Sequence, residues 1–353
     1  MPPSPIRVAP EDLDRFARAL LAAHAVPEAH AARLSEALLW ASLRGVDSHG
    51  IARLPRYLEL FASGEANREP QMSERILAPA VALIEADHAP GAVAMARAVA
   101  VGARIARDQG QGVAWVQVKG MVHAGAIGAY AEAVARQDLI GIVMLAGMPN
   151  MAWPGVRGAA VATSPLAIGI PAADAPPFLI DMATAMIALG QIRQYELRGE
   201  PLPEGCAVTA EGEPTTDPAK ARMPLPLGGI KGAGLSLAFE LLTSVLGGYP
   251  ILAPLHGGAP GAKRHRQNAA LIILDPACFG PAERFAAAVA ETLAAIRGLP
   301  RLSGSRAVTV PGDRGAATAA ERRAAGIPLP PRLATELEDL AAKAGLPPLP
   351  HRG

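Results

Sequence analysis

The sequence predicts an α/β protein in which both ends of the chain form a helical part around an α/β middle. Short apolar runs alternate with helical patterns between residues 80 and 297, which is typical of layered α/β structures. Apolar residues recur at helical spacing in the segments before and after that middle. At 353 residues the chain is long for one hydrophobic core, so we expect two domains.

The first part of the chain is predicted to be mostly helical up to about residue 75. Leu13, Phe16 and Leu20 recur on one helical face. Pro27 is expected to begin a second helix, and Gly64 to end a third. The predicted helices cover residues 11–25, 27–43 and 54–62.

The middle of the chain is predicted to alternate strands with helices. Residues 113–118 (VAWVQV) and 140–145 (IGIVML) are short apolar runs next to turn residues, as in buried strands. Residues 232–246 are expected to form an apolar, buried helix. The predicted strands are 80–86, 113–118, 140–145, 166–171, 178–181 and 269–274. The other predicted helices are 91–109, 125–136, 183–197 and 281–297, with loops at 146–164, 199–226 and 257–267.

The end of the chain is again predicted to be helical, at residues 316–325 and 331–344. A helical start and a helical end suggest one discontinuous helical domain. The predicted division is a helical domain from residues 1–75 and 285–353 around an α/β domain at 76–284.

Composition excludes several classes of protein. Apolar content is 50% and charged content 18%, so a sizeable core is available. The net charge of +1 without a charged block argues against nucleic acid or an anionic membrane surface as partner. Cys206 and Cys278 are far apart, which favours a reducing compartment. Because neither a signal segment nor an apolar run of about 18 residues is present, a cytoplasmic protein without a membrane span is expected.

The richest polar stretch is Arg44-Gly45-Val46-Asp47-Ser48-His49-Gly50, followed by Arg53 and Tyr57. Its glycines and short polar side chains predict a loop between helices. His49 is a natural acid or base, Ser48 could donate to a substrate oxygen, and Arg53 could bind a carboxylate through two N–H groups. Alternatively, Asp47 and Ser48 cap the following helix, with His49 in its first turn.

Two further stretches carry a single polar residue at the end of an apolar strand. His123 follows residues 113–118 on a turn flanked by glycines; it either faces a ligand at a helix start or caps that helix. Asp181 ends residues 178–181. It either holds the imidazole of a catalytic histidine in one tautomer or caps the next helix.

A third stretch, Leu227-Gly228-Gly229-Ile230-Lys231-Gly232, places one of only five lysines among glycines. Glycines let backbone N–H groups approach a phosphate, and the lysine adds a positive charge. The alternative is a flexible turn with a solvated lysine. The chain contains no G-x-G-x-x-G or P-loop motif, so a nucleotide would bind without either. It also contains no H-E-x-x-H or paired His/Cys set, so no metal is indicated.

Together these stretches resemble the malate/L-lactate dehydrogenase family, which has a sulfolactate dehydrogenase-like, non-Rossmann α/β fold. That family includes ureidoglycolate dehydrogenase, diketogulonate reductase and piperideine-carboxylate reductase. The resemblance runs nearly end to end, in order and spacing. The matching stretches are residues 44–57, His123-Ala124-Gly125, Thr163 to Ala167, Asp181-Met182-Ala183-Thr184, Thr216-Asp217-Pro218, Leu227 to Gly232, and Pro311-Gly312.

The resemblance implies a homodimer whose active site lies between the domains. It implies NAD or NADP as cofactor and a small 2-oxo or 2-hydroxy acid, or its imino or amino counterpart, as substrate. By position, His49 and His123 would be the acid/base candidates, Ser48 and Arg53 would orient the substrate, and Asp181 would support the site. The implied cofactor-binding residues are Ile180, Asp181, Met182, Ala183, Thr184, Lys231, Gly232, Pro311, Gly312 and Asp313.

The chain departs from the family pattern at several polar positions. It has Ala146-Gly147 where the family often has Thr-Asn, and Ser164, Ala185, Gln191 and Cys206 replace its usual Asn, Ser, Lys and Trp. Each lost hydrogen bond could weaken cofactor binding by about 0.5–1.5 kcal/mol. The alternative function is therefore a catalytically disused family member that serves as a ligand-binding or interaction protein. The sequence leaves the substrate, the choice of NAD or NADP, and the identity of the proton-carrying histidine open.

Overall fold

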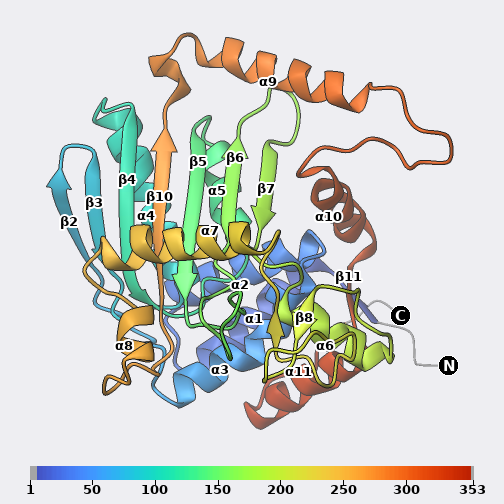
Figure 1. Cartoon of the computed structure of the whole chain (residues 1–353). Helices are drawn as coiled ribbons and strands as arrows, with labels where there is room; N and C mark the ends of the chain where they lie inside the picture. The colour runs from blue at the N-terminus through green and yellow to red at the C-terminus, as the bar shows by residue number, and fades with distance from the viewer. Residues whose placement is uncertain (1–5, 351–353) are drawn as a thin grey trace.

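The computed structural model describes residues 6–350, and its centre is a seven-stranded mixed sheet (Figure 1). The strands follow the order β2-β3-β4-β10-β5-β6-β7. Only β3 and β4 pair in parallel, and the other neighbours are antiparallel. The strands are β2 Ser73–Ala78, β3 Val81–Glu85, β4 Val113–Met121, β5 Ile140–Gly147, β6 Leu166–Ile170, β7 Phe178–Met182 and β10 Gln267–Leu274. The predicted α/β class is confirmed, and β2 is a strand that the sequence analysis missed.

Strand β10 lies at the middle of the sheet although it comes late in the chain (Figure 1). Its Leu271 pairs with Val116 of β4 on one side and with Val143 of β5 on the other. Strands buried on both faces carry nearly continuous apolar sequence, which explains the run from Ala269 to Leu274. The start of β10 brings the preceding loop to the same end of the sheet as the end of β4.

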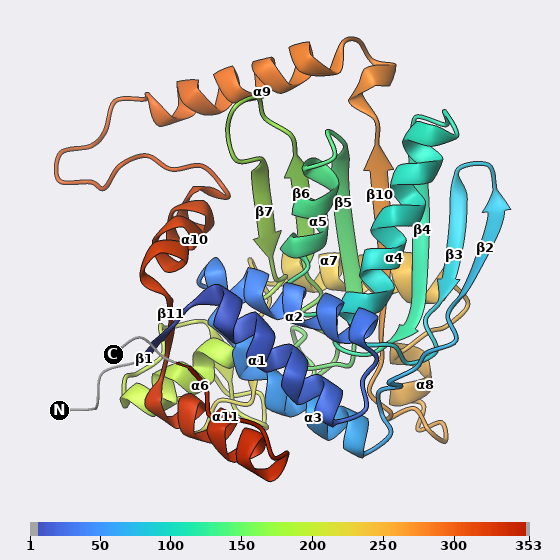
Figure 2. The same ribbon diagram turned by 180° about the vertical axis from the view of Figure 1, so that it is seen from behind.

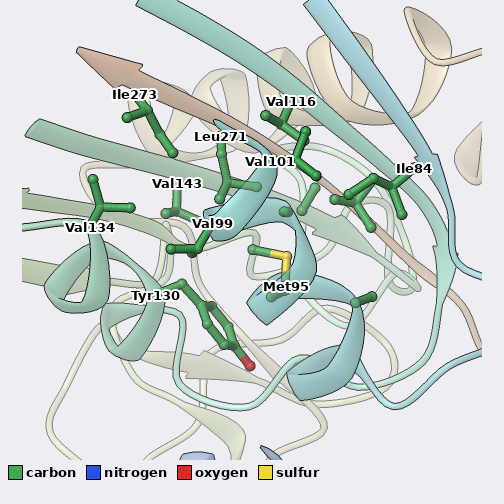
Figure 3. Packing of buried hydrophobic residues seen from close by; sticks show 14 of the residues in the cluster. Ile84, Met95, Val99, Val101, Val116, Tyr130, Val134, Val143, Leu271 and Ile273 are labelled. Atoms are coloured by element: carbon green, nitrogen blue, oxygen red, sulfur yellow. The ribbon is translucent and has the colours of Figure 1, made fainter. Parts of the chain in front are cut away.

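One face of the sheet is covered by α4 (Gly91–Ala103) and α5 (Gly128–Ala135), as Figure 2 shows. Figure 3 shows the core between these helices and the sheet, to which Met95 and Tyr130 of the helices and Val116 and Leu271 of the strands belong. Small residues let α4 lie directly on the strands. A Cβ at Gly102 would come 2.5 Å from Ile273, closer than real atoms pack, so only glycine fits there without a shift.

The opposite face is crossed by α7 (Ile230–Glu240), which continues as a π turn over Leu241–Val245 (Figure 1). Phe239 packs inward against Met144 and Ala270. The outer side is open: Ile230 is 59% exposed and Leu246 is 64% exposed. The prediction of a buried helix over residues 232–246 is therefore wrong for one of its faces, because the apolar sequence covers a side that this single chain does not bury.

Helices from both ends of the chain share one core, which confirms the predicted discontinuous helical part. The N-terminal contribution includes Leu13, Leu34 and Leu54, and the C-terminal contribution includes Ile327 and Leu337. Short antiparallel strands join the two ends (Figure 2). The elements are β1 Ile6–Val8, α1 Pro10–Ala23, α2 Glu28–Leu43, α3 Leu54–Ala62, α10 Asp313–Ala325, β11 Ile327–Leu329 and α11 Pro331–Lys343. Residues 1–5 and 351–353 of the predicted helical domain lie outside the described residues. Most of the N-terminal segment that was predicted to lack a signal also lies there.

Helix α9 (Ala282–Arg297) runs along one end of the sheet, apart from the helical core (Figure 1). The backbone carbonyl of Ala286 accepts a hydrogen bond of 3.1 Å from Ala173, in the turn after β6. An ion pair of 2.7 Å from Arg297 to Asp313 ties its end to α10. We therefore propose that the C-terminal part of the helical domain begins with α10 rather than at residue 285.

The remaining elements are short. Helix α6 (Leu189–Arg198) begins six residues later than predicted, because Met186 pairs with Leu225 through a backbone hydrogen bond of 2.8 Å. The other elements are β8 Ala207–Val208, β9 Met223–Pro224 and α8 Leu252–His256. In the described part of the chain, residues 6–350, every helix is too short or too polar to cross a bilayer.

Candidate functional site

Two histidines from distant segments meet below the sheet. His49 lies in a 3-10 turn, Asp47–His49, between α2 and α3, and His123 follows directly after β4. Their rings stack with centroids 5.7 Å apart and an angle of 16° between the planes. Both residues are half-buried. The structure thus brings together the two acid/base candidates that the sequence analysis singled out.

Tyr57 of α3 fixes the tautomer of His123. The Tyr57 hydroxyl lies 2.8 Å from the backbone carbonyl of His123 and 3.0 Å from its Nδ1. A carbonyl only accepts, so the single hydroxyl proton goes to it and the hydroxyl oxygen accepts from Nδ1–H. Nε2 of His123 is then left with a free lone pair. The alternative in which His123 caps the following helix is not observed, because the side-chain acceptor at the start of α5 is Asp181.

Burial keeps both imidazoles neutral near pH 7. Burial and then the positive charge of Arg53 lower the pKa of His49 to about 4. Burial, with the neighbouring His49 and Arg53, lowers the pKa of His123 well below its ordinary value. Desolvation disfavours the charged form of histidine. A neutral imidazole with a free Nε2 is suited to accept a proton.

Arg53 closes the loop that carries His49. Its Nε donates to the carbonyl of Ser48 over 2.7 Å, which leaves the two terminal amino groups for a ligand. Ser48 Oγ lies 3.0 Å from His49 Nδ1. Both terminal nitrogens of Arg322 in α10 donate to the Asp47 carboxylate, and the bond from Nη2 to Oδ2 is 3.1 Å long. The alternative in which Asp47 and Ser48 cap α3 is not observed, since α3 begins only at Leu54 without a side-chain cap.

A cavity of about 100 Å³ opens beside these residues. Its lining consists of Arg53, Arg56, Tyr57, Leu60, His123 and His265. No role in the site was predicted for Tyr57, Arg56 or His265. Arg56 could have been found from its position three residues after Arg53 at the start of the same helix. His265 comes from the predicted basic loop at residues 257–267, and no sequence signal places that loop against α3.

Asp181 makes neither of its two predicted contacts. Its Oδ2 accepts the Gly128 N–H of α5 over 2.9 Å, so it binds neither an imidazole nor the helix that follows β7. The residue as a whole reaches the surface, while its carboxyl group is packed by protein against Gly128. The surrounding protein raises the pKa of Asp181 to about 6 by desolvation, against the hydrogen bond from Gly128 and the charge of Arg44.

Arg44 links the histidine loop to the rest of the site. It forms a buried ion pair of 3.2 Å with Glu132 of α5, which also accepts from Trp40 Nε1 over 2.8 Å. A second amino group of Arg44 donates to the carbonyl of Gly312 over 3.2 Å. Helices α2, α5 and α10 are therefore held in one arrangement around the site.

The three stretches proposed for the cofactor lie around β7. Leu227 donates to the Thr184 carbonyl over 2.8 Å, which joins the lysine turn to the end of β7. Leu179 of β7 lies 3.4 Å from the carbonyl of Pro311. Ile180, Asp181 and Met182 belong to β7, Ala183 follows it, Lys231 and Gly232 open α7, and Gly312 and Asp313 open α10.

These residues fit a dinucleotide. Helices α7 and α10 follow Gly229 (φ 66°) and Gly312 (φ 101°), in a conformation that glycine adopts readily. The first N–H groups of such helices lack partners within the helix and favour phosphate. Lys231 is exposed. In the described part of the chain, Thr184 Oγ1 is buried without a hydrogen-bond partner, so a polar group of a bound dinucleotide could supply one.

The positions that depart from the family pattern have partners of their own. Ser164 accepts a hydrogen bond of 3.1 Å from Ser236 of α7. Gln191 accepts one of 3.2 Å from the Ala188 N–H at the start of α6. A Cβ at Gly147 would come 3.2 Å from Gln267, so that side chain occupies the space. Cys206 lies in a small apolar core with Ile187 and Leu202.

A larger cavity, about 660 Å³, lies beyond the lysine turn. Trp153 and Arg157 of the predicted irregular segment line it, together with Met186 and Glu211. Gly229 at the start of α7 also lines it, so this cavity adjoins Lys231. Within residues 6–350, no group of three or more His, Cys, Asp or Glu residues is placed to hold a metal ion.

Comparison with known proteins places these features in a family. A family profile described as malate/L-lactate dehydrogenase matches residues 8–338. The L-sulfolactate dehydrogenase of Methanocaldococcus jannaschii is 36% identical over 290 residues, 82% of this chain and 83% of that protein. The ureidoglycolate dehydrogenase (NAD(+)) of Escherichia coli O157:H7 is 31% identical over 86% of each chain. A Delta(1)-pyrroline-2-carboxylate/Delta(1)-piperideine-2-carboxylate reductase of Pseudomonas putida is 32% identical over 85% of this chain and 89% of that protein.

Solved structures agree with this match. Sulfolactate dehydrogenase from M. jannaschii superposes with a TM-score of 0.85 at 31% identity, over 97% of this chain and 98% of that one. Malate dehydrogenase from Pyrococcus horikoshii superposes with a TM-score of 0.87 at 28% identity, over 98% of this chain and 97% of that one. The similarity therefore covers the sheet, the helical part and the site together.

Proposed function

The chain belongs to the malate/L-lactate dehydrogenase family and is an oxidoreductase of that family; we propose that it interconverts a small 2-hydroxy acid, or a 2-amino acid, and its 2-oxo or imine form with NAD or NADP. One observation carries the proposal. The neutral imidazoles of His49 and His123 stack near the guanidinium of Arg53, and His123 lines one cavity together with Arg53. This set of groups can move a proton at C2 while a carboxylate is held in place.

In this proposal His123 is the acid/base. Its Nε2 takes the proton from the substrate hydroxyl during oxidation and returns it to the carbonyl or imine during reduction. Tyr57 is a positioning residue, because it binds Nδ1–H and thereby leaves Nε2 as the only proton-accepting nitrogen of the ring. His49 stacks on the ring of His123 and borders the site next to it.

Arg53 and Ser48 orient the substrate. The terminal amino groups of Arg53 match a carboxylate with two parallel hydrogen bonds. When the carboxylate is held, C2 lies at a fixed position relative to His123. The proton transfer then takes place between groups that are already correctly oriented. Ser48 supports the ring of His49 from the same loop.

The cofactor would be held by the three stretches around β7. When bound, its nicotinamide ring supplies the hydride to C2 or accepts it from C2. Lys231 and the starts of α7 and α10 provide positive potential for its phosphates. Asp181 to Thr184 face the same region from the end of β7. The proposed cofactor is NAD or NADP.

We also infer a homodimer. The outer side of α7 exposes Ile230, Leu241 and Leu246, an apolar surface that a second copy of the chain would cover. A mass in solution equal to a single chain would contradict this. For the compartment we propose the cytoplasm, since Cys206 and Cys278 are both unpaired.

Turnover and nucleotide binding test the proposed function. We expect the purified protein to oxidise NADH or NADPH with at least one small 2-oxo acid. We also expect the matching nucleotide to raise the melting temperature, because a ligand at about 100-fold over its Kd stabilises by about 2.7 kcal/mol. A melting temperature unchanged by both nucleotides, but raised by another metabolite, would instead favour the disused, ligand-binding alternative.

The pH dependence follows from the lowered pKa of His123. Reduction requires the protonated imidazole, whose fraction falls about tenfold per pH unit above its pKa. We expect log kcat/KM for reduction to decline with a slope of about −1 between about pH 6.5 and 8. Oxidation uses the neutral form, so its kcat/KM should stay flat over that range. A plateau in the reduction profile up to pH 7 would show that the proton donor has a higher pKa than this burial allows.

A further inference from the structure

One face of α10 lies against the segment that leads into the histidine loop (residues 45–50). Gly315, Thr318 and Arg322 follow one another at intervals of three and four residues, so they share one face of this helix. A Cβ at Gly315 would come 2.9 Å from Nη2 of Arg44, and a Cβ at Gly45 would come 3.3 Å from the methyl group of Thr318. The two glycines therefore let α10 pack closely on the end of α2 and on the turn that follows it.

Arg322 binds on both sides of that turn. Its guanidinium donates to the backbone carbonyl of Ser42, near the end of α2, and to the carboxylate of Asp47 in the loop. The Arg322 side chain is only 11% exposed, so these contacts hold it in place. Ser42 also holds the other end of the loop, because its Oγ accepts the Ile51 N–H over 2.9 Å. Both ends of the loop are thus fixed at Ser42, to which Arg322 is bound.

Arg322 is the distant hydrogen-bond partner of the histidine loop. Within residues 6–350, the other hydrogen bonds of residues 45–50 stay between residues 41 and 53. One of them is the bond of 2.7 Å from Arg53 Nε to the Ser48 carbonyl. Bonds between neighbours in the sequence close the turns of the loop but do not fix its place in the fold. The bonds from α10 therefore help to fix where Ser48 and His49 lie in the site.

The other end of α10 lies at the proposed cofactor site. The Gly312 carbonyl at the start of the helix accepts a hydrogen bond of 3.2 Å from Arg44. The negative charge of Asp313, in the first turn, is offset by its ion pair of 2.7 Å with Arg297, so the helix start remains suited to an anion. A diphosphate bound there would favour the docked position of the whole helix. With 13 residues, α10 spans about 20 Å between the two sites.

We propose that Arg322 and Asp47 are positioning residues that link the histidine loop to the cofactor site through α10. A nucleotide bound at the start of α10 then stabilises the loop arrangement in which Ser48 and Arg53 meet the substrate. This inference rests on the proposed function and adds a coupling between its two ligands. Because such a coupling is reciprocal, bound substrate also strengthens nucleotide binding. Couplings of this kind typically change an affinity by about 5- to 150-fold.

Hydrogen–deuterium exchange in residues 45–53 measures the coupling. The probe is ADP-ribose, with 2′-phospho-ADP-ribose in a parallel arm for NADP. Each fragment carries the diphosphate of the cofactor but lacks the nicotinamide ring that would face the histidines. We expect the fragment that binds, at a saturating concentration, to slow exchange in this segment by about 5- to 150-fold. The slowing then reaches the loop through the protein and not through contact with the ring.

Two variants break the link, and a third is the matched control. Arg322→Gln and Asp47→Asn should each abolish most of the slowing, while the fragment still raises the melting temperature. Asparagine keeps the shape of Asp47, so this variant guards against a folding defect. Glu321→Gln is the control, since Glu321 pairs over 2.8 Å with Arg7 from the neighbouring position of α10. It should keep the slowing of the unaltered protein.

Steady-state kinetics give a second readout. His123 and Tyr57 lie outside the histidine loop, so kcat of Arg322→Gln with both substrates saturating should stay within about threefold. Its KM for the 2-oxo acid should rise by about 5- to 150-fold, because the loop is no longer stabilised by the bound nucleotide. A merely structural role of Arg322 would lower the melting temperature and the active fraction but leave KM unchanged.

The possible failures are distinguishable. Equal slowing of exchange in Arg322→Gln and in the unaltered protein would overturn the coupling, and so would a fragment that stabilises the unaltered protein without slowing exchange in the loop. Stabilisation by the whole nucleotide but by neither fragment would also overturn it, because the diphosphate would then not be held at α10. If neither NADH nor NADPH raises the melting temperature and no 2-oxo acid is turned over, the proposed function itself fails.

Discussion

Replacing His123 by asparagine should lower kcat by about 10²–10⁴-fold, the contribution typical of a positioned acid/base. Asparagine keeps a side-chain N–H close to the place of Nδ1, so the contact with Tyr57 is retained. It lacks any group at the position of Nε2, and the proton at the substrate oxygen then has no acceptor. Steady-state rates in both directions, with saturating nucleotide, measure the effect.

The matched control for that experiment is His24→Asn. His24 binds the Leu20 carbonyl at the end of α1 and does not line the cavity. Its kcat should be unchanged. If His123→Asn stays within about threefold of the unaltered kcat and folds normally, His123 is not the acid/base, and His49 becomes the remaining candidate.

Replacing Arg53 by methionine should lower kcat/KM by about 10²–10³-fold, because the carboxylate beside C2 loses both of its hydrogen bonds and its countercharge. The stem of the side chain keeps its packing. Losing the 2.7 Å bond to the Ser48 carbonyl should cost about 1 kcal/mol of unfolding free energy. Added guanidinium ion should restore part of the activity at low millimolar substrate.

Guanidinium rescue separates a substrate contact from a folding defect. Arg33→Met serves as control, since Arg33 is an exposed residue of α2 whose partner is Glu36 on the same helix. If Arg53→Met keeps its kcat/KM, or if it loses activity only through a fall in melting temperature, then Arg53 does not hold the substrate.

Local sequence pattern predicted most of the large elements. Helices α1 and α2 and strands β4, β5 and β10 carry strong apolar periodicity or dense apolar runs, and each lies within a few residues of its predicted place. Strand β2 was missed because it is an edge strand whose residues are mostly exposed, so no alternating pattern marks it. Strands β1 and β11 pair across nearly the whole chain, and three-residue segments carry too little pattern to predict such a pairing.

The error at α7 has a different cause. The apolar sequence of α7 indicates that the helix is buried, but not which surface buries it. In a single chain one side of the helical segment faces solvent, where Leu241 and Leu246 are exposed. Sequence hydrophobicity does not distinguish burial within a chain from burial against a second copy. The proposed homodimer would account for the difference.

The site was predictable as a set of residues but not as a set of contacts. His49, Arg53 and His123 were recognised from motifs, and the structure brings them to one place. The tautomer of His123 depends on Tyr57, which sequence placed in the motif without a role. His265 reaches the cavity only because the loop before β10 folds against α3. Asp181 binds α5 rather than a histidine, since its strand packs beside that helix.

Hydride transfer between cofactor and substrate is the central claim, and isotope tracing measures it directly. The purified protein is incubated with a small 2-oxo acid and a reduced nicotinamide cofactor deuterated at C4 of the ring. We expect deuterium at C2 of the 2-hydroxy acid product, with either NADH or NADPH as the label donor and with His123→Asn nearly inactive. A hydroxy acid product without deuterium from label on either face of the ring, or no product with either cofactor, would contradict the assignment.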